Sequence, residues 1–489
     1  MTLADNCFED IRSAIADMSA DVSNDAVGAH APSLEEIYAP ETHAAVLDPR
    51  SPIVQGSRGT GKSFWAGVLG DSELRAAAAT AYPHIGLDRV DVAFGYTGIE
   101  GPNGIGRDRL DRCVPPNGGS DEARSFFWAT ILRAQASAAG KSAPRLQDLL
   151  PDASDPDKRE AILAESDLSL KKSGKSLLIV YDALDTVATS WPRRRLLTQA
   201  LLEVVWAMRA YRSIRVKLFL RPDQLDDDEL RFVELPKLRT GAVRLTWSGT
   251  DLYGLLFARL LLGPAQRSFG QLLSSINLRP NSRNEILARK WSLGNNEAQQ
   301  RMVMASLAGS FMADGAHGHK KGNTYDWPLR HLSDALREVT PRSFLGLMIA
   351  AAKYGPVPSG RAITPAGIQH GLRAASKTRV EQLHQEFPWI KGVLAPLAGL
   401  LLPQDERQVF TAWRRASTIG NALEDSVRHG YLPPITPGLD KSASEQALYL
   451  ALEKIGVMMR REAEDRRIDM PDLYRVAAKL LKKGGTAPL

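Results

Sequence analysis

Residues 56–63 read Gly56-Ser57-Arg58-Gly59-Thr60-Gly61-Lys62-Ser63, directly after the apolar stretch Pro52-Ile53-Val54. The octet matches the pattern G-x-x-x-x-G-K-[ST] of a phosphate-binding loop. Its glycines permit backbone conformations in which successive N–H groups turn towards an anion. We expect the Lys62 amine to reach the β- and γ-phosphates and the Ser63 hydroxyl to hold Mg²⁺. All eight residues are therefore candidates for binding ATP.

The neighbouring sequence supplies the context that such a loop needs. The apolar stretch before it predicts a strand, and Phe64 to Leu69 predict the start of a helix whose positive end faces the phosphates. A chance match is the alternative, and a second Gly174-Lys175-Ser176 illustrates it. That copy has Ser169 where the pattern requires glycine, and a strand rather than a helix is predicted after it. We interpret the second copy as a decoy.

Composition sets the broad class. A chain of 489 residues predicts two or three domains, and 44% hydrophobic with 24% charged residues is ordinary for a soluble protein. No run of about 18 apolar residues predicts a membrane span, and the N-terminus does not resemble a secretion signal, so we expect a cytoplasmic protein. Cys7 and Cys113 are too few for a disulfide framework. His317 and His319, beside two lysines, resemble a solvated loop more than a metal site.

The net charge of +6 is unevenly distributed. Lys320 to Leu489 carry 25 Lys/Arg and 17 Asp/Glu, so the rest of the chain is slightly acidic. This basic C-terminal third is compatible with a nucleic-acid partner, although an ordinary soluble surface can have the same surplus.

A second acidic strand is expected beside a phosphate-binding loop. Leu177 to Tyr181 form a continuous apolar run that ends at Asp182, as in a buried parallel strand. Asp182 would hold Mg²⁺ through water, and Asp185 would orient or deprotonate the attacking water. The alternatives are a capping or turn aspartate at 182 and a first-turn helix aspartate at 185.

A third strand is predicted at Val216 to Leu220. Arg221 follows it and is our candidate for a residue that points at the γ-phosphate and reports hydrolysis. The alternative is a salt bridge from Arg221 to Asp223 or to the acidic run at 226–228. Residues 242–247 then predict a short strand, and residues 250–256 predict a capped helix.

These parts together resemble ATPases of the AAA+/STAND division, especially their Orc-like and KAP-like bacterial branches. The phosphate-binding loop is followed by LLIVYDALD (177–185), VKLFLRPD (216–223) and VRLTWSGTDLYGLLFARL (243–260), and the resemblance covers residues 35–350. Two features depart from AAA+ proteins. Ala183 rather than an acid follows Asp182, and about 120 residues separate Ser63 from Asp182. We therefore expect an insertion at about 95–170, with loops around one amphipathic helix near 126–132.

The resemblance also implies arginines that contact phosphate. In Thr340-Pro341-Arg342, the proline suits a first helical turn and Arg342 would reach back to the γ-phosphate as sensor 2. The alternative is a surface arginine near Glu338. Arg193 to Arg195 would supply an arginine finger to a neighbouring subunit of a homo-oligomer, or would form a solvated basic loop.

The last part of the chain predicts a winged helix. Residues 444–452 form an amphipathic pattern, and two short strands are expected around the charged tip 462–465. The arginines beside this tip could meet phosphates of DNA, and the tail adds further positive charge: Arg460, Arg461, Arg466, Arg467, Lys479, Lys482 and Lys483. A protein-interaction winged helix, or a helical pair with a solvated connection, is the alternative.

We therefore predict an α/β protein with a P-loop NTPase parallel-sheet core, a helical lid and a mainly helical C-terminal region. The predicted divisions are 1–34, 35–260, 261–353 and 354–489. The predicted function is an ATP-hydrolysing, Mg²⁺-dependent switch or motor, and the resemblance alone implies action on DNA in bacterial defence or DNA maintenance. The alternative is a nucleotide-sensing scaffold with little turnover that acts through protein partners. A small-molecule phosphotransferase is disfavoured because such kinases are commonly near 200 residues.

Overall fold

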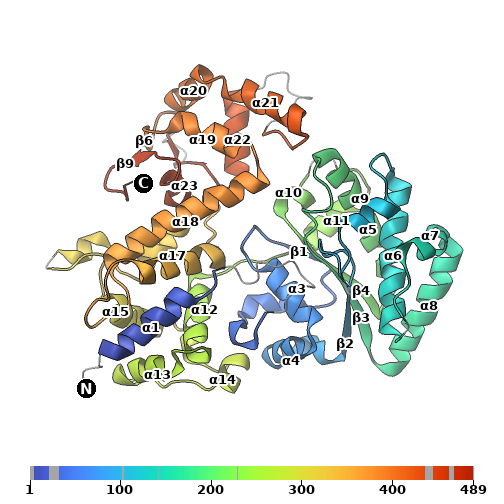
Figure 1. Cartoon of the computed structure of the whole chain (residues 1–489), viewed down its shortest axis with the longest axis horizontal. Helices are drawn as coiled ribbons and strands as arrows, with labels where there is room; N and C mark the ends of the chain where they lie inside the picture. The colour runs from blue at the N-terminus through green and yellow to red at the C-terminus, as the bar shows by residue number, and fades with distance from the viewer. Residues whose placement is uncertain are drawn as a thin grey trace. The chain divides into compact units, whose positions relative to one another are not determined.

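The computed structural model (Figure 1) describes most of the chain, in these ranges: 5–20, 32–101, 104–140, 142–227, 230–315, 317–434, 444–461 and 467–487. The chain divides into two compact units. We call residues 21–246 with 287–290 the sheet unit, and residues 1–20, 247–286 and 291–489 the helical unit. The boundaries expected near residues 34, 260 and 353 stay predictions.

A parallel five-stranded sheet forms the centre of the sheet unit, and it confirms the predicted α/β fold class. Its strand order is β2-β3-β4-β1-β5, and every neighbouring pair is parallel. The strands are β1 (Ile53–Gln55), β2 (Val90–Phe94), β3 (Ser176–Tyr181), β4 (Ile214–Leu220) and β5 (Val243–Arg244). Four of the five strands were predicted from the sequence, and the edge strand β2 was not.

Helices cover both faces of this sheet, as a parallel sheet requires. Ile214, Val216 and Leu218 of β4 pack in one core with α6, whereas Phe219 packs in a second core with α3 and α4. Figure 1 shows α6 on one side of the strands and α3 with α4 on the other. The helices of this unit are α2 (Ala44–Leu47), α3 (Lys62–Gly70), α4 (Ser72–Ala81), α5 (Arg107–Cys113), α6 (Ser120–Ala138), α7 (Leu146–Ser154), α8 (Pro156–Ser173), α9 (Trp191–Ala207), α10 (Pro222–Leu225) and α11 (Leu235–Thr240).

The region expected to be an insertion contains more helix than the sequence indicated. One helix near 126–132 was predicted, and it is present as part of α6, but α5, α7 and α8 also form within residues 107–173. Leu163 is the residue that α8 buries among those the structure describes. Leu163 is buried whereas Leu168 is 52% exposed, so the apolar residues of α8 do not form the single stripe by which such helices are recognised.

Lys217 is an unusual cation in the middle of the sheet. Its side chain is fully buried, and Nζ donates hydrogen bonds to the carbonyl oxygens of Asp48 (2.9 Å) and Ser51 (2.7 Å). These bonds hold the turn that leads into β1, and so they help to fix the strand that precedes the phosphate-binding loop. Burial lowers the pKa of Lys217 to about 7, although the nearby charge of Asp48 opposes this shift.

We expect Lys217 to make the stability of the protein rise with pH. Between pH 7 and the ordinary lysine pKa of 10.5, the unfolded chain holds a proton that the folded chain has released, so raising the pH favours folding. The expected gain is about 2 kcal/mol between pH 7 and pH 9. Calorimetry of the wild type and Lys217→Met at each pH measures the difference. Equal pH dependence in both proteins would contradict the assignment.

The helical unit is built around a closely packed helix pair. In α17 and α18, a Cβ atom placed on Gly371 of α18 would lie 2.3 Å from the carbonyl oxygen of Leu347 in α17, so the two backbones approach closely at this glycine. The first helices of the unit are α1 (Asp5–Asp17), α12 (Gly249–Leu262), α13 (Gln266–Ser275), α14 (Arg283–Leu287), α15 (Glu297–Ala308), α16 (Asp326–Leu332), α17 (Pro341–Lys353) and α18 (Pro365–Glu386).

The N-terminal helix α1 belongs to this helical unit despite its distance in sequence. Arg12 of α1 is buried and donates hydrogen bonds to the carbonyl oxygens of Tyr354, Gly355 and Ala362. Cys7 donates to the carbonyl oxygen of Ser268. The helix α1 therefore contacts segments that lie more than 250 residues further along the chain.

The C-terminal elements contain the parts expected for a winged helix but do not establish one. The predicted helix is α22, and β7 pairs with β8 in an antiparallel ladder. The predicted tip at 462–465 and Arg466 lie outside the described residues. The remaining elements are α19 (Ile390–Leu394), α20 (Glu406–Arg415), α21 (Thr418–His429), α22 (Glu445–Lys454), α23 (Asp472–Arg475), β6 (Leu401–Leu402), β7 (Met459–Arg460), β8 (Ile468–Asp469) and β9 (Leu481–Lys482).

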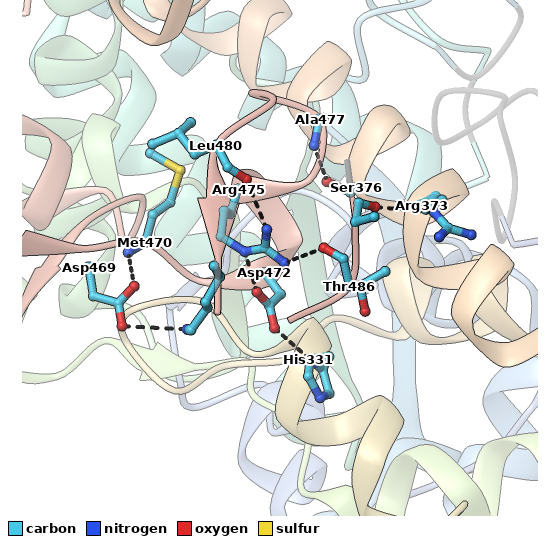
Figure 2. A network of polar contacts seen from close by, with 12 residues as sticks. His331, Arg373, Ser376, Asp469, Met470, Asp472, Arg475, Ala477, Leu480 and Thr486 are labelled. Carbon is cyan, nitrogen blue, oxygen red and sulfur yellow. Dashed lines mark hydrogen bonds and ion pairs between the residues drawn. The ribbon is translucent and has the colours of Figure 1, made fainter. Parts of the chain in front are cut away.

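A buried polar network anchors the end of the chain inside the helical unit (Figure 2). Arg475 is fully buried, and its guanidinium donates to Asp472 (2.5 Å) and to the carbonyl oxygens of Leu480 (2.9 Å) and Thr486 (2.8 Å). The other oxygen of Asp472 contacts Nδ1 of His331 on α16 at 2.5 Å. Burial alone would raise the pKa of Asp472, but these two partners outweigh it and lower the pKa to about 2.

Candidate nucleotide site

The predicted phosphate-binding loop connects the carboxyl end of β1 to the first turn of α3. Gly59 and Gly61 adopt φ angles of +84° and +100°, in the left-handed region that side chains disfavour. A Cβ atom on Gly56 would lie 2.6 Å from the Thr60 hydroxyl oxygen, so a larger residue would clash there. The glycines of the motif are therefore required by the conformation that the loop adopts.

The Lys62 ammonium lies over this loop. Nζ donates hydrogen bonds to the carbonyl oxygens of Gly56 (2.7 Å) and Ser57 (3.1 Å), and the Thr60 hydroxyl donates to the same Ser57 oxygen (2.8 Å). The positive end of α3 begins at Lys62 itself. A cation, a helix N-terminus and a glycine-rich turn thus coincide, and this combination suits a phosphate group. Arg58 is a partly exposed member of the loop.

Asp182 follows β3 and is buried next to the loop. Its side chain is 1% exposed, and it forms a hydrogen bond with Ser63 of the motif. Its Oδ2 atom has no hydrogen-bond partner among the residues that the structure describes. Burial raises the pKa of Asp182, while the Ser63 hydrogen bond and the Lys62 charge act in the opposite direction. A buried carboxylate oxygen without a hydrogen-bond partner costs free energy of folding unless a ligand binds to it.

These groups fit a magnesium ion. The Ser63 hydroxyl and the unpaired oxygen of Asp182 are hard oxygen donors, which Mg²⁺ prefers. Within the described ranges, no group of three or more His, Cys, Asp or Glu side chains could hold a metal. An ion held by few protein ligands, with phosphate oxygens and water completing its shell, is the usual arrangement for Mg²⁺.

A tight turn carries the chain from Asp182 to Asp185. Ala183 adopts a φ of +54°, which is uncommon for alanine, and the Thr186 amide donates to its carbonyl oxygen. Tyr96, which follows β2, supports this turn: its carbonyl oxygen accepts from the Asp182 amide (3.1 Å), and its hydroxyl contacts Thr186 (3.0 Å). Burial raises the pKa of Tyr96 to about 12. Because α9 begins at residue 191, Asp185 does not occupy a first helical turn.

Arg221 lies at the carboxyl end of β4 and takes part in a charge cluster. Its guanidinium forms two hydrogen bonds to Asp223, at 2.8 and 2.6 Å, so the alternative salt bridge considered from the sequence does form. Nη1 of Arg221 also lies 3.7 Å from the Asp185 carboxylate. The structure thus brings together two of the predicted site residues: Asp185, which follows β3, and Arg221, which follows β4.

The three arginines 193–195 belong to the first turns of α9 rather than to a basic loop. Arg193 pairs with Asp111 (2.8 Å) and Arg195 pairs with Asp227 (2.7 Å). Arg194 donates to the Ala188 carbonyl oxygen, and burial lowers its pKa, with the neighbouring charge of Arg221 acting in the same direction. Each arginine therefore has a partner in its own chain, and a role in a neighbouring subunit stays a prediction.

The remaining predicted arginines belong to the helical unit. Arg342 is in the first turn of α17 and follows Pro341 and the capping residue Thr340, as predicted. Its approach to a nucleotide in the sheet unit stays a prediction. Beside the proposed wing, Arg460 pairs with Glu406 (2.9 Å) and Arg461 pairs with Asp469 (3.3 Å).

Sequence reasoning missed Tyr96, which supports this site from a neighbouring element, and it gave Arg194 a different role, as part of an arginine finger. Tyr96 follows β2, which was not predicted, so no pattern pointed to its position. Arg194 lies in a run of three arginines, and its approach to the cluster depends on the angle at which α9 leaves the turn. The only available signal was its nearness in sequence to Asp185.

Comparisons with known proteins add little to this geometry. No family model matches the chain, and no curated protein matches it. Among solved structures, the chain is similar to the ORC2 protein of Aeropyrum pernix, solved as ADPNP–ADP complexes, with 12% sequence identity. The match covers 94% of this chain and 93% of that one, at a TM-score of 0.32. This score is too low to support an argument, so the fold assignment rests on the sheet itself. No helix in the described part of the chain is long and apolar enough to cross a membrane.

Proposed function

We propose that this protein binds ATP with Mg²⁺ on the phosphate-binding loop and hydrolyses it, as a switch or motor of the AAA+/STAND type. The observation that carries the proposal is the buried, unpartnered Oδ2 of Asp182 beside Ser63, at the end of a loop whose backbone and Lys62 are arranged for phosphate. A metal–phosphate complex would satisfy both the buried carboxylate and the loop N–H groups.

The roles of the residues follow from their positions. Lys62 and the loop N–H groups would bind the β- and γ-phosphates and stabilise charge that develops during transfer. Ser63 and Asp182 would hold Mg²⁺, which neutralises the phosphate charge. Asp185, 35% exposed in its side chain, would orient or deprotonate the attacking water. Arg221, held by Asp223, would sense the γ-phosphate from the end of β4, and Arg342 would do so from the helical unit.

Asp182→Asn tests this proposal. We expect half-saturation with Mg²⁺, measured through phosphate release from ATP, to require about 10- to 100-fold more metal in the variant. In the wild type the required Mg²⁺ concentration should rise as the pH falls towards the raised pKa of Asp182, because protons then compete with the metal for this carboxylate. Unchanged metal dependence in Asp182→Asn would contradict the metal assignment.

The alternative function is a nucleotide-sensing scaffold with little turnover that works through protein partners. The ion pair between Arg221 and Asp185 favours this alternative, since it engages the candidate water-activating carboxylate. Phosphate release with and without duplex DNA distinguishes the two. Turnover that Asp185→Asn abolishes without weakening ATP binding supports the enzyme, whereas bound ATP without turnover supports the scaffold. Action on DNA in bacterial defence or DNA maintenance, and homo-oligomerisation, remain part of the proposal that rests on the resemblance alone.

A further inference from the structure

The connection between α15 and α16, in the helical unit, forms a surface that carries aromatic and basic side chains (α15 is labelled in Figure 1). Its base is a short hairpin: Phe311 and Asn323 form an antiparallel bridge, and the Met312 amide donates to the Gly322 carbonyl oxygen (2.9 Å). We call residues 309–324 the basic hairpin. Ala316 lies outside the described residues.

Close backbone contacts and hydrogen bonds within the basic hairpin hold its backbone in place. A Cβ atom on Gly318 would lie 2.1 Å from the carbonyl oxygen of Ala313, and the Lys320 amide donates to the His317 carbonyl oxygen (3.1 Å). The short helix η7 (Gly318–Lys321) carries the basic side chains. The hairpin therefore presents its side chains from a folded backbone.

Aromatic rings follow one another along this hairpin. The Phe311 side chain is 43% exposed, and its ring centroid lies 6.4 Å from that of His319. The His319 ring is in turn 6.4 Å from the ring of His317. A large apolar ring left exposed beside two imidazoles forms a surface on which planar groups can stack.

The charge of the hairpin is positive. Lys320 and Lys321 are exposed, and neither has an ion-pair partner among the residues that the structure describes. Asp314 is the only acidic residue of the segment, and Arg361, which lies in the loop before α18, pairs with it at 3.2 Å. The two lysines thus remain available for an anionic partner.

A cavity of about 500 Å³ adjoins the hairpin. Met312, Ala313 and Asp314 line one side of it, and Arg361, Thr364 and Gln369 contribute to the other. Its volume falls within the range of sites that accept small molecules or single groups of a larger ligand.

We propose that the basic hairpin binds single-stranded nucleic acid, with Lys320 and Lys321 on the phosphates and Phe311 with His319 against the bases. Exposed rings with adjacent cations are what a strand with unpaired bases requires, since each base offers a face for stacking and each nucleotide a phosphate. A duplex hides its base faces, so the rings would add nothing to duplex binding. This surface is separate from the wing arginines Arg460 and Arg461, which are occupied by ion pairs within the chain. The inference does not depend on the proposed ATP site.

The test measures the anisotropy of a labelled 20-nucleotide poly-dT strand with the full-length protein and no ATP. Lys320→Glu/Lys321→Glu should weaken binding by about tenfold or more and reduce the slope of log affinity against log salt by about 1.4. Lys171→Glu/Lys172→Glu, at exposed positions near the end of α8, makes the same charge change and should alter the affinity by about twofold or less.

Stacking is tested separately from charge. Phe311→Ala should weaken binding to the single strand by at least about fivefold, and Phe311→Trp should preserve it. Binding to a duplex of the same length should not change in Phe311→Ala. Thermal unfolding of each variant checks that it is folded.

Several results would overturn the proposal. These are no binding by the wild-type protein, equal losses in the hairpin and α8 variants, or a Phe311→Ala protein that binds the single strand normally. Competition by polyglutamate as effective as that by poly-dT would instead assign the surface to an acidic protein.

Discussion

Lys62→Ala should abolish most of the affinity for ATP, by about 100-fold or more, because an ammonium that donates to two phosphates contributes several kcal/mol of charge-assisted hydrogen bonding. In the structure the same Nζ bonds the carbonyl oxygens of Gly56 and Ser57, so the loop itself holds the amine in position over the phosphate-binding turn. Equilibrium binding of a fluorescent ATP analogue, with phosphate release measured in parallel, would quantify the loss.

The chain contains its own control for this experiment. Lys175 lies in the second Gly-Lys-Ser, but Gly174 caps the end of α8 and Ser176 begins β3, so no loop surrounds this lysine. Its Nζ lies 3.3 Å from Asp91 on the surface. Lys175→Ala should therefore bind ATP like the wild type. Equal losses in the two variants, or no loss with Lys62→Ala, would refute nucleotide binding at residues 56–63.

Arg475→Met should destabilise the helical unit by about 3–5 kcal/mol, because it removes one partner of a buried ion pair. Asp472 would keep a buried charge with only His331 beside it, and the carbonyl oxygens of Leu480 and Thr486 would lose their donor. Since the chain has two compact units, a single melting temperature does not isolate this effect. The rate of amide hydrogen exchange isolates the effect. The Leu480 amide reports on it directly, because this amide donates a hydrogen bond to the Arg475 carbonyl oxygen.

We expect the exchange of the residue 468–481 amides to become about 100-fold faster or more in Arg475→Met, since each 1.4 kcal/mol corresponds to a factor of ten. Arg373→Met is the matched control from the same network (Figure 2). Arg373 is partly exposed and makes one bond of 3.3 Å, to the carbonyl oxygen of Ala487, so its loss should change exchange by less than about threefold. Similar rates in both variants would show that the buried network does not anchor this end of the chain.

The sequence predicted the three inner strands β1, β3 and β4 and the short edge strand β5, but it missed the edge strand β2. Residues 177–181 are continuously apolar, and all five are buried in β3. In β2, at the sheet edge, only Val90 is buried and Asp91 interrupts the pattern. An edge strand needs fewer apolar residues because fewer neighbours cover it, so its sequence carries a weaker signal. The helix α8 was not predicted because its apolar residues do not gather on one face of the helix.

The candidate site also has some features that the sequence could predict and others that it could not. The glycines, Lys62 and Ser63 could be identified from eight consecutive residues, because the conformation of the loop depends on local backbone freedom and on side chains within a few residues. Asp182 was also predicted, since a carboxylate at the end of an apolar strand is a local pattern. Its unpaired oxygen could not be predicted, because that depends on which distant groups surround it.

Sequence alone therefore determined the α/β class, the loop and the identity of the carboxylate beside it. The tertiary structure decided the partners: Ser63 for Asp182, Asp185 for Arg221, and His331 for Asp472. These pairs join residues that are 36 to 141 positions apart in the chain. Pairing at such separation depends on how strands and helices pack, because the energy of an ion pair or a hydrogen bond is set by distance and burial in space and leaves no periodic trace in the sequence.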